Sequence, residues 1–310
     1  MKIYRYSQGV SLCEKTAVAL GFFDGVHEGH RRLLKTARDA ARKKGLSFAV
    51  FTFTSKSGFK GASVIYPTEQ KLALLESLGV EIVVMADFSE ISSICAKDFV
   101  EKCLFGDMGC RLAVAGYDFC YGKGREGNAK SLSESLAMLG AECIIESEHR
   151  IDGEKISTTK IKELLSSGNV AEAHQYLGLP YHLICTVERG RGVGRRLGFP
   201  TVNSKIDPSY ALLRLGVYRT AVEIDEKLYT GVTNVGTCPT FEEREVHAET
   251  YIVDYDGDLY GEKIRVLFLD FLRDEKKFNS SEELIMQINV DKNRAIKENG
   301  DLKWLEIGQN

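Results

Sequence analysis

The hydrophobic pattern of the chain changes near residue 180, and this change constrains the fold more than any other feature. Before it, runs of consecutive apolar residues alternate with helix-like stretches; the runs cover residues 16–22, 46–53, 80–88, 111–119 and 142–147. Consecutive apolar positions are typical of parallel strands that are covered on both faces. The first part is therefore predicted to be a Rossmann-like, doubly wound parallel sheet of the α/β class.

The second part of the chain has strands in which apolar and polar residues alternate. They cover residues 182–189, 217–224, 228–235, 247–254 and 263–271. A last amphipathic helix begins after Ser280 or Ser281, either of which can cap it, and turns Leu284, Ile288 and Ala295 to one side. These features predict a mostly β domain, a small antiparallel β-barrel with a closing C-terminal helix.

Length and composition favour two domains in an ordinary globular protein. A chain of 310 residues is about twice a typical domain, and we place the domains at residues 1–180 and 181–310, with a hinge at Gly178-Leu179-Pro180. No apolar run approaches the roughly 20 residues of a membrane span, and the N-terminus does not resemble a secretory signal. We therefore expect a cytoplasmic protein without a membrane partner.

Charge and cysteine usage narrow the expected partners. The eight cysteines are scattered singly, which indicates reduced thiols rather than a zinc site or a disulfide framework. The net charge of −3 argues against bulk binding of nucleic acid. Small-molecule partners are expected, and the sequence gives no prediction of oligomeric state.

Residues 21–30, Gly-Phe-Phe-Asp-Gly-Val-His-Glu-Gly-His, leave a predicted strand and enter a basic amphipathic helix that Gly45 ends. The free N–H groups and positive dipole of a helix N-terminus favour a bound phosphate. His27 and His30 can face that phosphate as hydrogen-bond donors and stabilise charge on an α-phosphate under attack. Gly29 leaves room for a nucleotide. The two histidines could instead be metal ligands or capping residues.

Residues 156–162, Ile-Ser-Thr-Thr-Lys-Ile-Lys, open another helix that ends at Gly168. Hydroxyl groups followed by cations suit phosphates, although Ser157 or Thr158 could simply be the N-cap. Together with the two histidines, this segment resembles nucleotidyltransferases of the His-x-Gly-His type. Residues 21–30 look especially like the adenylyltransferase half of bacterial bifunctional riboflavin kinase/FAD synthetases, and residues 115–127 are similar to the flavin-side loop of that family.

The resemblance implies that the first domain transfers AMP from ATP to FMN, with His27 and His30 as its catalytic residues. It implies ATP contacts by Gly21, Phe22, Asp24, Gly29, Ser157, Thr158, Thr159 and Lys162, and flavin contacts by Asp118 and Tyr121. The sequence departs from the family at Thr54-Ser55-Lys56-Ser57, where Asp-Pro-His-Pro is usual, and at Lys160 and Lys162, where arginines are usual. Lysine loses bidentate phosphate geometry, so altered ATP handling is expected.

In residues 187–203, glycines and arginines precede Pro200-Thr201-Val202-Asn203. Glycine N–H groups can wrap an anion, arginines can hold phosphates, and the oxygens of Thr201 and Asn203 suit Mg²⁺ carried by ATP. An exposed basic turn or an RNA-binding patch is the alternative, but no aromatic residue is interleaved for base stacking.

Residues 197–203 resemble the signature of riboflavin kinases, and the likeness continues through residues 216–218, 233–241, 256–261 and 271–278. Glu249 lies in an alternating strand, and kinase chemistry needs a base for the substrate hydroxyl. By itself it would be an exposed edge glutamate; by the resemblance it is the catalytic base. The likeness also implies ATP contacts by Arg189, Gly190, Gly194, Arg195 and Gly198, flavin contacts by Arg273 and Phe278, and Mg²⁺ ligation by Thr201 and Asn203.

The sequence thus predicts a bifunctional enzyme that phosphorylates riboflavin to FMN and adenylylates FMN to FAD with release of pyrophosphate. Its substrates and products are ATP, riboflavin, FMN and FAD, and Mg²⁺ is the expected metal. One alternative keeps the kinase and makes the first domain weak or regulatory. Another is a flavin-responsive RNA-binding regulator that uses residues 189–196, against which the net acidity and the intact residues 200–203 count.

Overall fold

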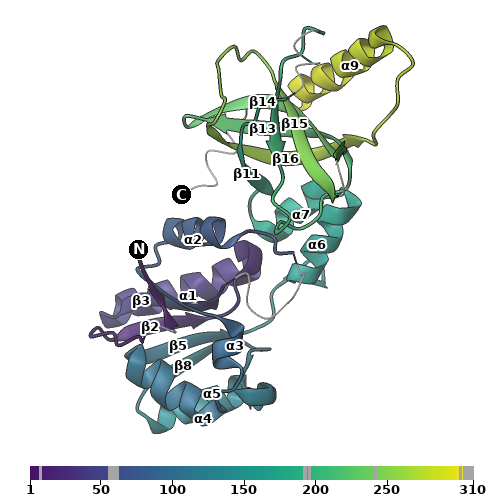
Figure 1. Ribbon diagram of the computed structural model, residues 1–310. Coiled ribbons are helices and arrows are strands. Elements are labelled where there is room, and N and C mark those ends of the chain that lie inside the picture. Colours follow the sequence, from purple (N-terminus) through teal and green to yellow (C-terminus); the bar gives the residue numbers. More distant parts are fainter. Residues whose placement is uncertain are drawn as a thin grey trace. The chain divides into compact units, whose positions relative to one another are not determined.

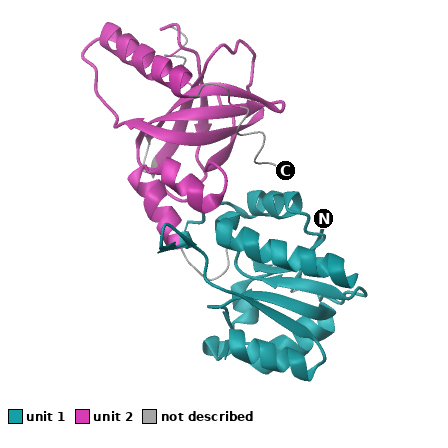
Figure 2. Ribbon diagram, turned by 180° about the vertical axis from the view of Figure 1, so that it is seen from behind, with its two compact units in different colours: residues 1–158 teal, residues 159–310 magenta. Residues whose placement is uncertain are grey.

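The computed structural model describes residues 1–6, 9–54, 63–190, 194, 197–240, 243–299 and 302. The chain separates into two compact units, residues 1–158 and 159–310 (Figure 2). Helices α6 (Thr158–Ser167) and α7 (Val170–Leu177) fall almost wholly in the second unit, where α7 packs on strand β16 (Lys263–Arg273). The compact units therefore divide ahead of the hinge that the sequence suggests at Gly178-Leu179-Pro180, because these helices are held by contacts with the later strands.

The first unit contains the predicted parallel sheet. Its strands are β1 (Lys2–Arg5), β2 (Thr16–Leu20), β3 (Ser47–Phe53), β4 (Ile82–Ala86), β5 (Cys110–Gly116) and β8 (Glu142–Glu146), in the order β1-β4-β3-β2-β5-β8. Every pairing between them is parallel. The five strands predicted from apolar runs are confirmed, and the edge strand β1, whose four residues are mostly exposed, was not predicted.

Both faces of this sheet are covered, as the consecutive apolar positions predict. Ala17 and Ala19 of β2 face α1 (Glu28–Lys44) and α2 (Thr68–Ser77), whereas Val18 and Leu20 face η3 (Phe99–Asp107) and α5 (Ala129–Met138) (Figure 1). Gly45 ends α1 as predicted, since its φ is 64° and its N–H bonds to the carbonyl of Ala41. The fold is therefore doubly wound.

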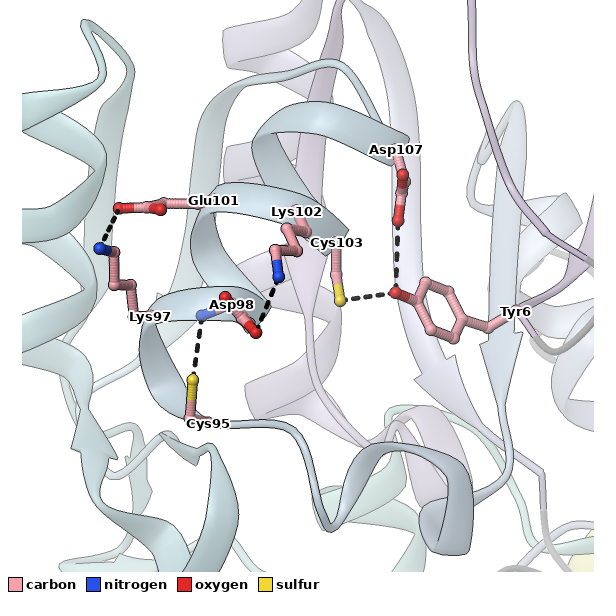
Figure 3. Close-up of polar contacts among 8 residues, drawn as sticks. All are labelled: Tyr6, Cys95, Lys97, Asp98, Glu101, Lys102, Cys103 and Asp107. Carbon is pink, nitrogen blue, oxygen red and sulfur yellow. Dashed lines mark hydrogen bonds and ion pairs between the residues drawn. The ribbon is translucent and has the colours of Figure 1, made fainter.

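Smaller elements complete the first unit. They are η2 (Asp24–Val26), α3 (Phe88–Ile91), α4 (Ala96–Asp98), β6 (Cys120–Tyr121), η4 (Lys123–Arg125), β7 (Gly127–Asn128), β9 (Arg150–Ile151) and β10 (Glu154–Lys155). Tyr6, just after β1, anchors η3: its Oη lies 2.6 Å from Sγ of Cys103 and 3.3 Å from Oδ2 of Asp107 (Figure 3). Burial raises the pKa of the Cys103 thiol, so this side chain packs as a neutral group. All cysteines with described side chains are free thiols.

The second unit is the predicted antiparallel barrel. Its strands are β11 (His182–Thr186), β16, β13 (Gly216–Ile224), β14 (Lys227–Thr240), β15 (Glu243–Ile252) and β12 (Thr201–Lys205), in the order β11-β16-β13-β14-β15-β12. The barrel nearly closes, because the chain after β11 forms a bridge to β12 in which the N–H of Glu188 donates to the carbonyl of Asn203 at 2.7 Å. Strand β12 was not predicted as a strand.

Helix α9 (Ser281–Asn299) covers one face of the barrel (Figure 1). Ser280 caps it, since its Oγ accepts from the N–H of Glu283 at 3.3 Å, and Ala295 packs on Val217 and Val232. The predicted closing helix is confirmed. In the part of the chain that the structure describes, every helix is too short or too polar to cross a membrane.

Candidate active sites

The turn between β2 and α1 has a strained backbone. Phe23 and Val26 have positive φ angles of 53° and 44° and are fully buried. Gly25 also has a positive φ, of 74°, and a Cβ there would lie 2.7 Å from the side chain of Ile65. Non-glycine residues in this region cost about 1–3 kcal/mol each and persist where packing fixes them, often at functional sites. The packing of this turn determines where His27 and His30 lie.

His27 and His30 form a stacked pair of neutral imidazoles. Their ring centroids are 3.6 Å apart with an interplanar angle of 12°. Nδ1 of His27 accepts the backbone N–H of His30 at 3.3 Å, which caps α1 and leaves the ring proton on Nε2. Burial lowers the pKa of His27 to about 4 and that of His30 well below its ordinary value. At neutral pH the pair can donate hydrogen bonds but carries no charge.

Capping is thus one role of His27, as the alternative from sequence allowed, but it does not account for His30. Nδ1 of His30 is buried and has no hydrogen-bond partner among the described residues. Gly29 favours this close packing, since a Cβ there would lie 3.3 Å from the His27 ring, a tight contact. Among the described residues, no three His, Cys, Asp or Glu side chains are grouped to hold a metal ion.

The stacked histidines line a pocket at the carboxyl ends of the parallel strands, the usual place for ligands in such sheets. We name it the histidine pocket; its wall consists of His27, Gly29, His30, Arg32, Leu33, residues 116–118, residues 146–149 and residues 155–158. The predicted Gly29, Asp118, Ser157 and Thr158 thus meet the two histidines here. Asp118 is ion-paired with Lys155 at 3.0 Å.

Other predicted residues of the first site have different surroundings. Asp24 is buried and accepts the N–H of Ile65 at 2.8 Å, and the Phe22 ring stacks on Phe53. A Cβ on Gly21 would lie 3.0 Å from the Phe23 ring. Tyr121 lies in the hydrophobic core, with its Oη 3.2 Å from Ser131. Thr159 and Lys162 belong to the second compact unit. Residues 55–57, in the segment where the sequence departs from the family, lie outside the described residues.

Several residues of the histidine pocket were missed by sequence reasoning. Glu146, at the end of β8, accepts from Oγ1 of Thr36 at 2.6 Å and pairs with Arg32 at 3.3 Å. Arg32 and Lys155 are the cations of the wall. Glu146 could have been found from its position at the end of a predicted parallel strand, because the carboxyl end of β8 lies at the same sheet edge as that of β5.

The buried His27 makes the stability of the first unit depend on pH. Its pKa is about 4 in the folded protein and 6.5 in an ordinary imidazole, so between these values the unfolded chain binds a proton that the folded chain does not. The free energy of unfolding should therefore fall as pH falls from 6.5 to 4, by about 3 kcal/mol from this residue. Calorimetric unfolding at pH 7 and pH 4.5 should show a smaller fall in His27→Asn; equal falls would contradict the prediction.

In the second unit, a row of polar side chains crosses three strands. Glu249 of β15 stands opposite Asn203 of β12 and Asn234 of β14, so the three lie on the same face of the barrel. Glu249 is exposed and lines a pocket between the barrel and α9, which we name the helix-side pocket. Its wall includes Gly194, Leu197, Phe199, Thr201, Val217, Val232, Asn234, Glu249, Tyr251, Arg273, Phe278, Leu284, Ile288 and Asp291. A mostly apolar wall with a few polar groups is typical of a small-molecule site.

Arg273 is an internal residue of this pocket and not a surface charge at a strand end, the alternative that sequence left open. Its Nε and Nη2 donate to the same carboxylate oxygen of Asp291, at 2.9 and 2.8 Å. Only 7% of the Asp291 side chain is exposed, and Gln287 also donates to it. The guanidinium lies 5.9 Å from the centre of the Phe278 ring. This ion pair joins α9 to the end of β16; neither Asn234 nor Asp291 was predicted.

A second pocket of the barrel, which we name the loop-side pocket, shares Thr201 with the first. Val187, residues 200–202, Ile252 and residues 255–260 form its wall, and Thr201 lines both pockets. The Arg189 guanidinium lies 5.5 Å from the centre of the Tyr260 ring of this wall. Of residues 255–260, the family resemblance in the sequence covers 256–260, to which it gives no role in binding.

The predicted glycines of the preceding loop are places of close approach. A Cβ on Gly190 would lie 2.2 Å from Nδ2 of Asn203, and one on Gly194 would lie 2.3 Å from the carbonyl oxygen of Phe199. Gly198 has a φ of +83°. Arg195 lies outside the described residues. A larger residue at Gly190 or Gly194 would therefore require its neighbours to move, and the backbone of Gly198 has a conformation that favours glycine.

Comparison with known proteins gives the family. A family model described as FAD synthetase matches residues 11–160, and one described as riboflavin kinase matches residues 177–298. A bifunctional riboflavin kinase/FMN adenylyltransferase from Bacillus subtilis is 35% identical over 293 residues, which are 91% of this chain and 92% of that protein. The chain belongs to the bifunctional riboflavin kinase/FMN adenylyltransferase family. The family resemblance seen in the sequence is confirmed.

A second relative of the riboflavin kinase/FMN adenylyltransferase family agrees, and a solved structure with a different description has a similar fold. The protein of the same description from Escherichia coli is 31% identical over 302 residues, or 94% of this chain and 96% of that protein. A solved structure described as a macrolide-efflux protein from Streptococcus pneumoniae has a TM-score of 0.86 and 30% identity, covering 97% of this chain and all of that chain. The histidine pair falls in the FAD synthetase match and Glu249 in the riboflavin kinase match.

Proposed function

We propose that this enzyme makes both flavin cofactors: the second unit phosphorylates riboflavin to FMN with ATP, and the first unit transfers AMP from ATP to FMN, releasing pyrophosphate. The bifunctional activity is that of its family. The observation that carries the assignment of residues is that each family-model match contains its own pocket, with the histidine pair in the first and Glu249 in the second.

In the kinase reaction, Glu249 accepts the proton of the riboflavin hydroxyl as that oxygen attacks the γ-phosphorus of ATP. The bond between the γ-phosphorus and the β-phosphate oxygen breaks, and ADP leaves. The flavin lies in the helix-side pocket, whose wall includes the predicted Arg273 and Phe278. The nucleotide lies in the loop-side pocket, near Arg189 and the predicted glycines. Thr201 lines both pockets, so phosphoryl transfer takes place at this shared wall.

Thr201 and Asn203 are the proposed Mg²⁺ ligands. Hydroxyl and amide oxygens are hard donors that suit this ion, and Asn203 stands opposite Glu249, so the residues present fit a metal that arrives with ATP. Held by these two residues, Mg²⁺ would neutralise part of the charge on the phosphates. The pairing of Asn203 with Glu249 supports a ligand set close to the proposed base.

Replacing Thr201 with alanine should weaken the magnesium dependence of the kinase, because one of the two proposed ligands is lost. We expect the Mg²⁺ concentration for half-maximal FMN formation to rise about tenfold, which corresponds to a loss of about 1.4 kcal/mol in the free energy of Mg²⁺ binding. A Mg²⁺ titration at saturating ATP measures this, and Thr230→Ala, on strand β14, is a control. An unchanged titration in Thr201→Ala would remove Thr201 from the set of ligands.

In the adenylyl reaction, a phosphate oxygen of FMN attacks the α-phosphorus of ATP, a P–O bond forms, and pyrophosphate leaves. Imidazole N–H groups of His27 and His30 stabilise the charge that develops on the α-phosphate, with no covalent intermediate. Ser157 and Thr158 face the same pocket, and Arg32 and Lys155 contribute its positive charge.

The assignment is tested by chromatography of flavins after the pure protein is incubated with riboflavin and ATP, and separately with FMN and ATP. We expect FMN and then FAD from the first mixture and FAD from the second. FMN without FAD in either mixture would favour the alternative in which the first unit is regulatory.

A further inference from the structure

Lys71 is a buried cation beside the turn between β2 and α1, residues 21–27, which we name the histidine turn. It lies on α2, and only 2% of it is exposed. Burying a charged group costs free energy unless its hydrogen bonds are satisfied. A purely structural position on this helix would more readily hold an apolar residue, so the charge requires an explanation.

The ammonium group of Lys71 contacts the ends of two neighbouring strands. Nζ donates to the carbonyl oxygen of Phe53, where β3 ends, at 2.6 Å, and to that of Phe22, just after β2, at 3.3 Å. Oγ1 of Thr52 lies at 3.4 Å and itself donates to the same Phe22 carbonyl at 2.9 Å. Nζ is also 5.1 Å from the centre of the Phe22 ring. The three donors of the ammonium thus hold the first residues of the turn that leads to His27.

The charged and titratable groups near Lys71 come from two elements besides its own. Burial lowers the pKa of Lys71 to about 8, although the negative charge of Asp24 on η2 acts in the opposite direction and favours the charged form. Its positive charge in turn helps to lower the pKa of His30 on α1. At neutral pH the site therefore combines two uncharged imidazoles with a protonated lysine behind them.

We propose that Lys71 is a positioning residue for adenylyl transfer, which fixes the histidine turn and supplies a positive charge at neutral pH beside two imidazoles that carry none. Neutral imidazoles donate hydrogen bonds, but the developing charge on a polyphosphate is stabilised further by a preorganised cation that needs no reorganisation. This inference rests on the proposed function of the first unit, and it adds a residue that lies outside the wall of the histidine pocket.

The test uses the full chain and measures FAD formation from FMN and ATP as a function of pH. In the unaltered protein, kcat should fall as pH rises through about 8, because Lys71 loses its proton there. Lys71→Met should lower kcat at pH 7 by about 10- to 100-fold and abolish this alkaline fall. Lys71→Arg, which stays charged, should retain more activity than Lys71→Met and also lack the fall.

Two controls separate this role from a structural one. FMN formation by the kinase unit of the same preparations should be unchanged, and the exposed Lys130→Met should leave FAD formation and its pH profile unaltered.

A kcat for FAD formation that is flat between pH 7 and 9.5 in the unaltered protein would overturn the proposal even if Lys71→Met failed to fold. If Lys71→Met lowered kcat by the same factor at every pH and retained the alkaline fall, Lys71 would have a structural role only. Absence of FAD from the unaltered protein would instead refute the proposed function.

Discussion

Glu249→Gln is expected to lower the rate of FMN formation from riboflavin by about 10²- to 10⁴-fold, the usual contribution of a general base. Glutamine has nearly the same shape, but its amide cannot accept the proton of the substrate hydroxyl. Because Glu249 is exposed on the face of the barrel and lines the helix-side pocket, the substitution should leave the fold intact. Initial rates of FMN formation at saturating riboflavin and ATP measure the effect.

The same strand offers a matched control. Glu245 lies four residues before Glu249, on the same face of β15, but it is ion-paired with Lys205. Glu245→Gln should leave FMN formation within about twofold, since exposed ion pairs contribute little. FAD formation from supplied FMN should be unchanged in both variants. A near-normal kinase rate in Glu249→Gln would exclude this residue as the base.

His30→Ala is expected to lower FAD formation by about 10²- to 10³-fold, the usual effect of removing a donor to developing charge, while FMN formation remains. The kinase activity of the same preparation reports how much of the second unit is folded and active, because Glu249 and the histidines belong to different compact units. Rates of FAD formation from FMN and ATP measure the effect. Parallel loss of both activities would contradict the division between the two units.

His27 needs a more specific substitution, because it both caps α1 and faces the pocket. Asparagine is a good N-cap residue that has no imidazole, so His27→Asn separates the two roles, whereas His27→Ala removes both. FAD formation should fall by a similar factor in both variants, while only His27→Ala should lose the roughly 1 kcal/mol that a cap contributes. Full activity in His27→Asn would reduce His27 to a capping residue.

Much of the fold follows from local patterns in the sequence. Consecutive apolar residues predicted the parallel strands, since β2, β3, β4 and β5 have residues buried on both faces, and alternation predicted the barrel. The edge strands β1 and β12 were missed for different reasons. Strand β1 is four residues long and mostly exposed, and β12 follows a glycine- and arginine-rich loop and is fixed in part by the bridge between Glu188 and Asn203.

Some features of the candidate sites could likewise be predicted from the sequence, whereas others depend on the tertiary structure. The position of His27 and His30 at a helix start and that of Glu249 in an alternating strand could be read from the sequence, because both depend on neighbours along the chain. The stacking of the imidazoles, their neutral state and the sharing of Thr201 by two pockets could not, because they depend on packing between segments.

Lys71 and Asp291 show most clearly what could not be predicted from the sequence. Each is a charged residue on a helix, where sequence favours a solvated position, yet each is almost fully buried. Lys71 is held by the ends of two strands and Asp291 by Arg273 of a third. The sequence by itself determined the two fold classes and the family, and it suggested the motifs that we propose to be catalytic, because hydrophobic periodicity and motif spacing are local properties. Only the tertiary structure decided which charges are buried, because their partners lie far away along the chain.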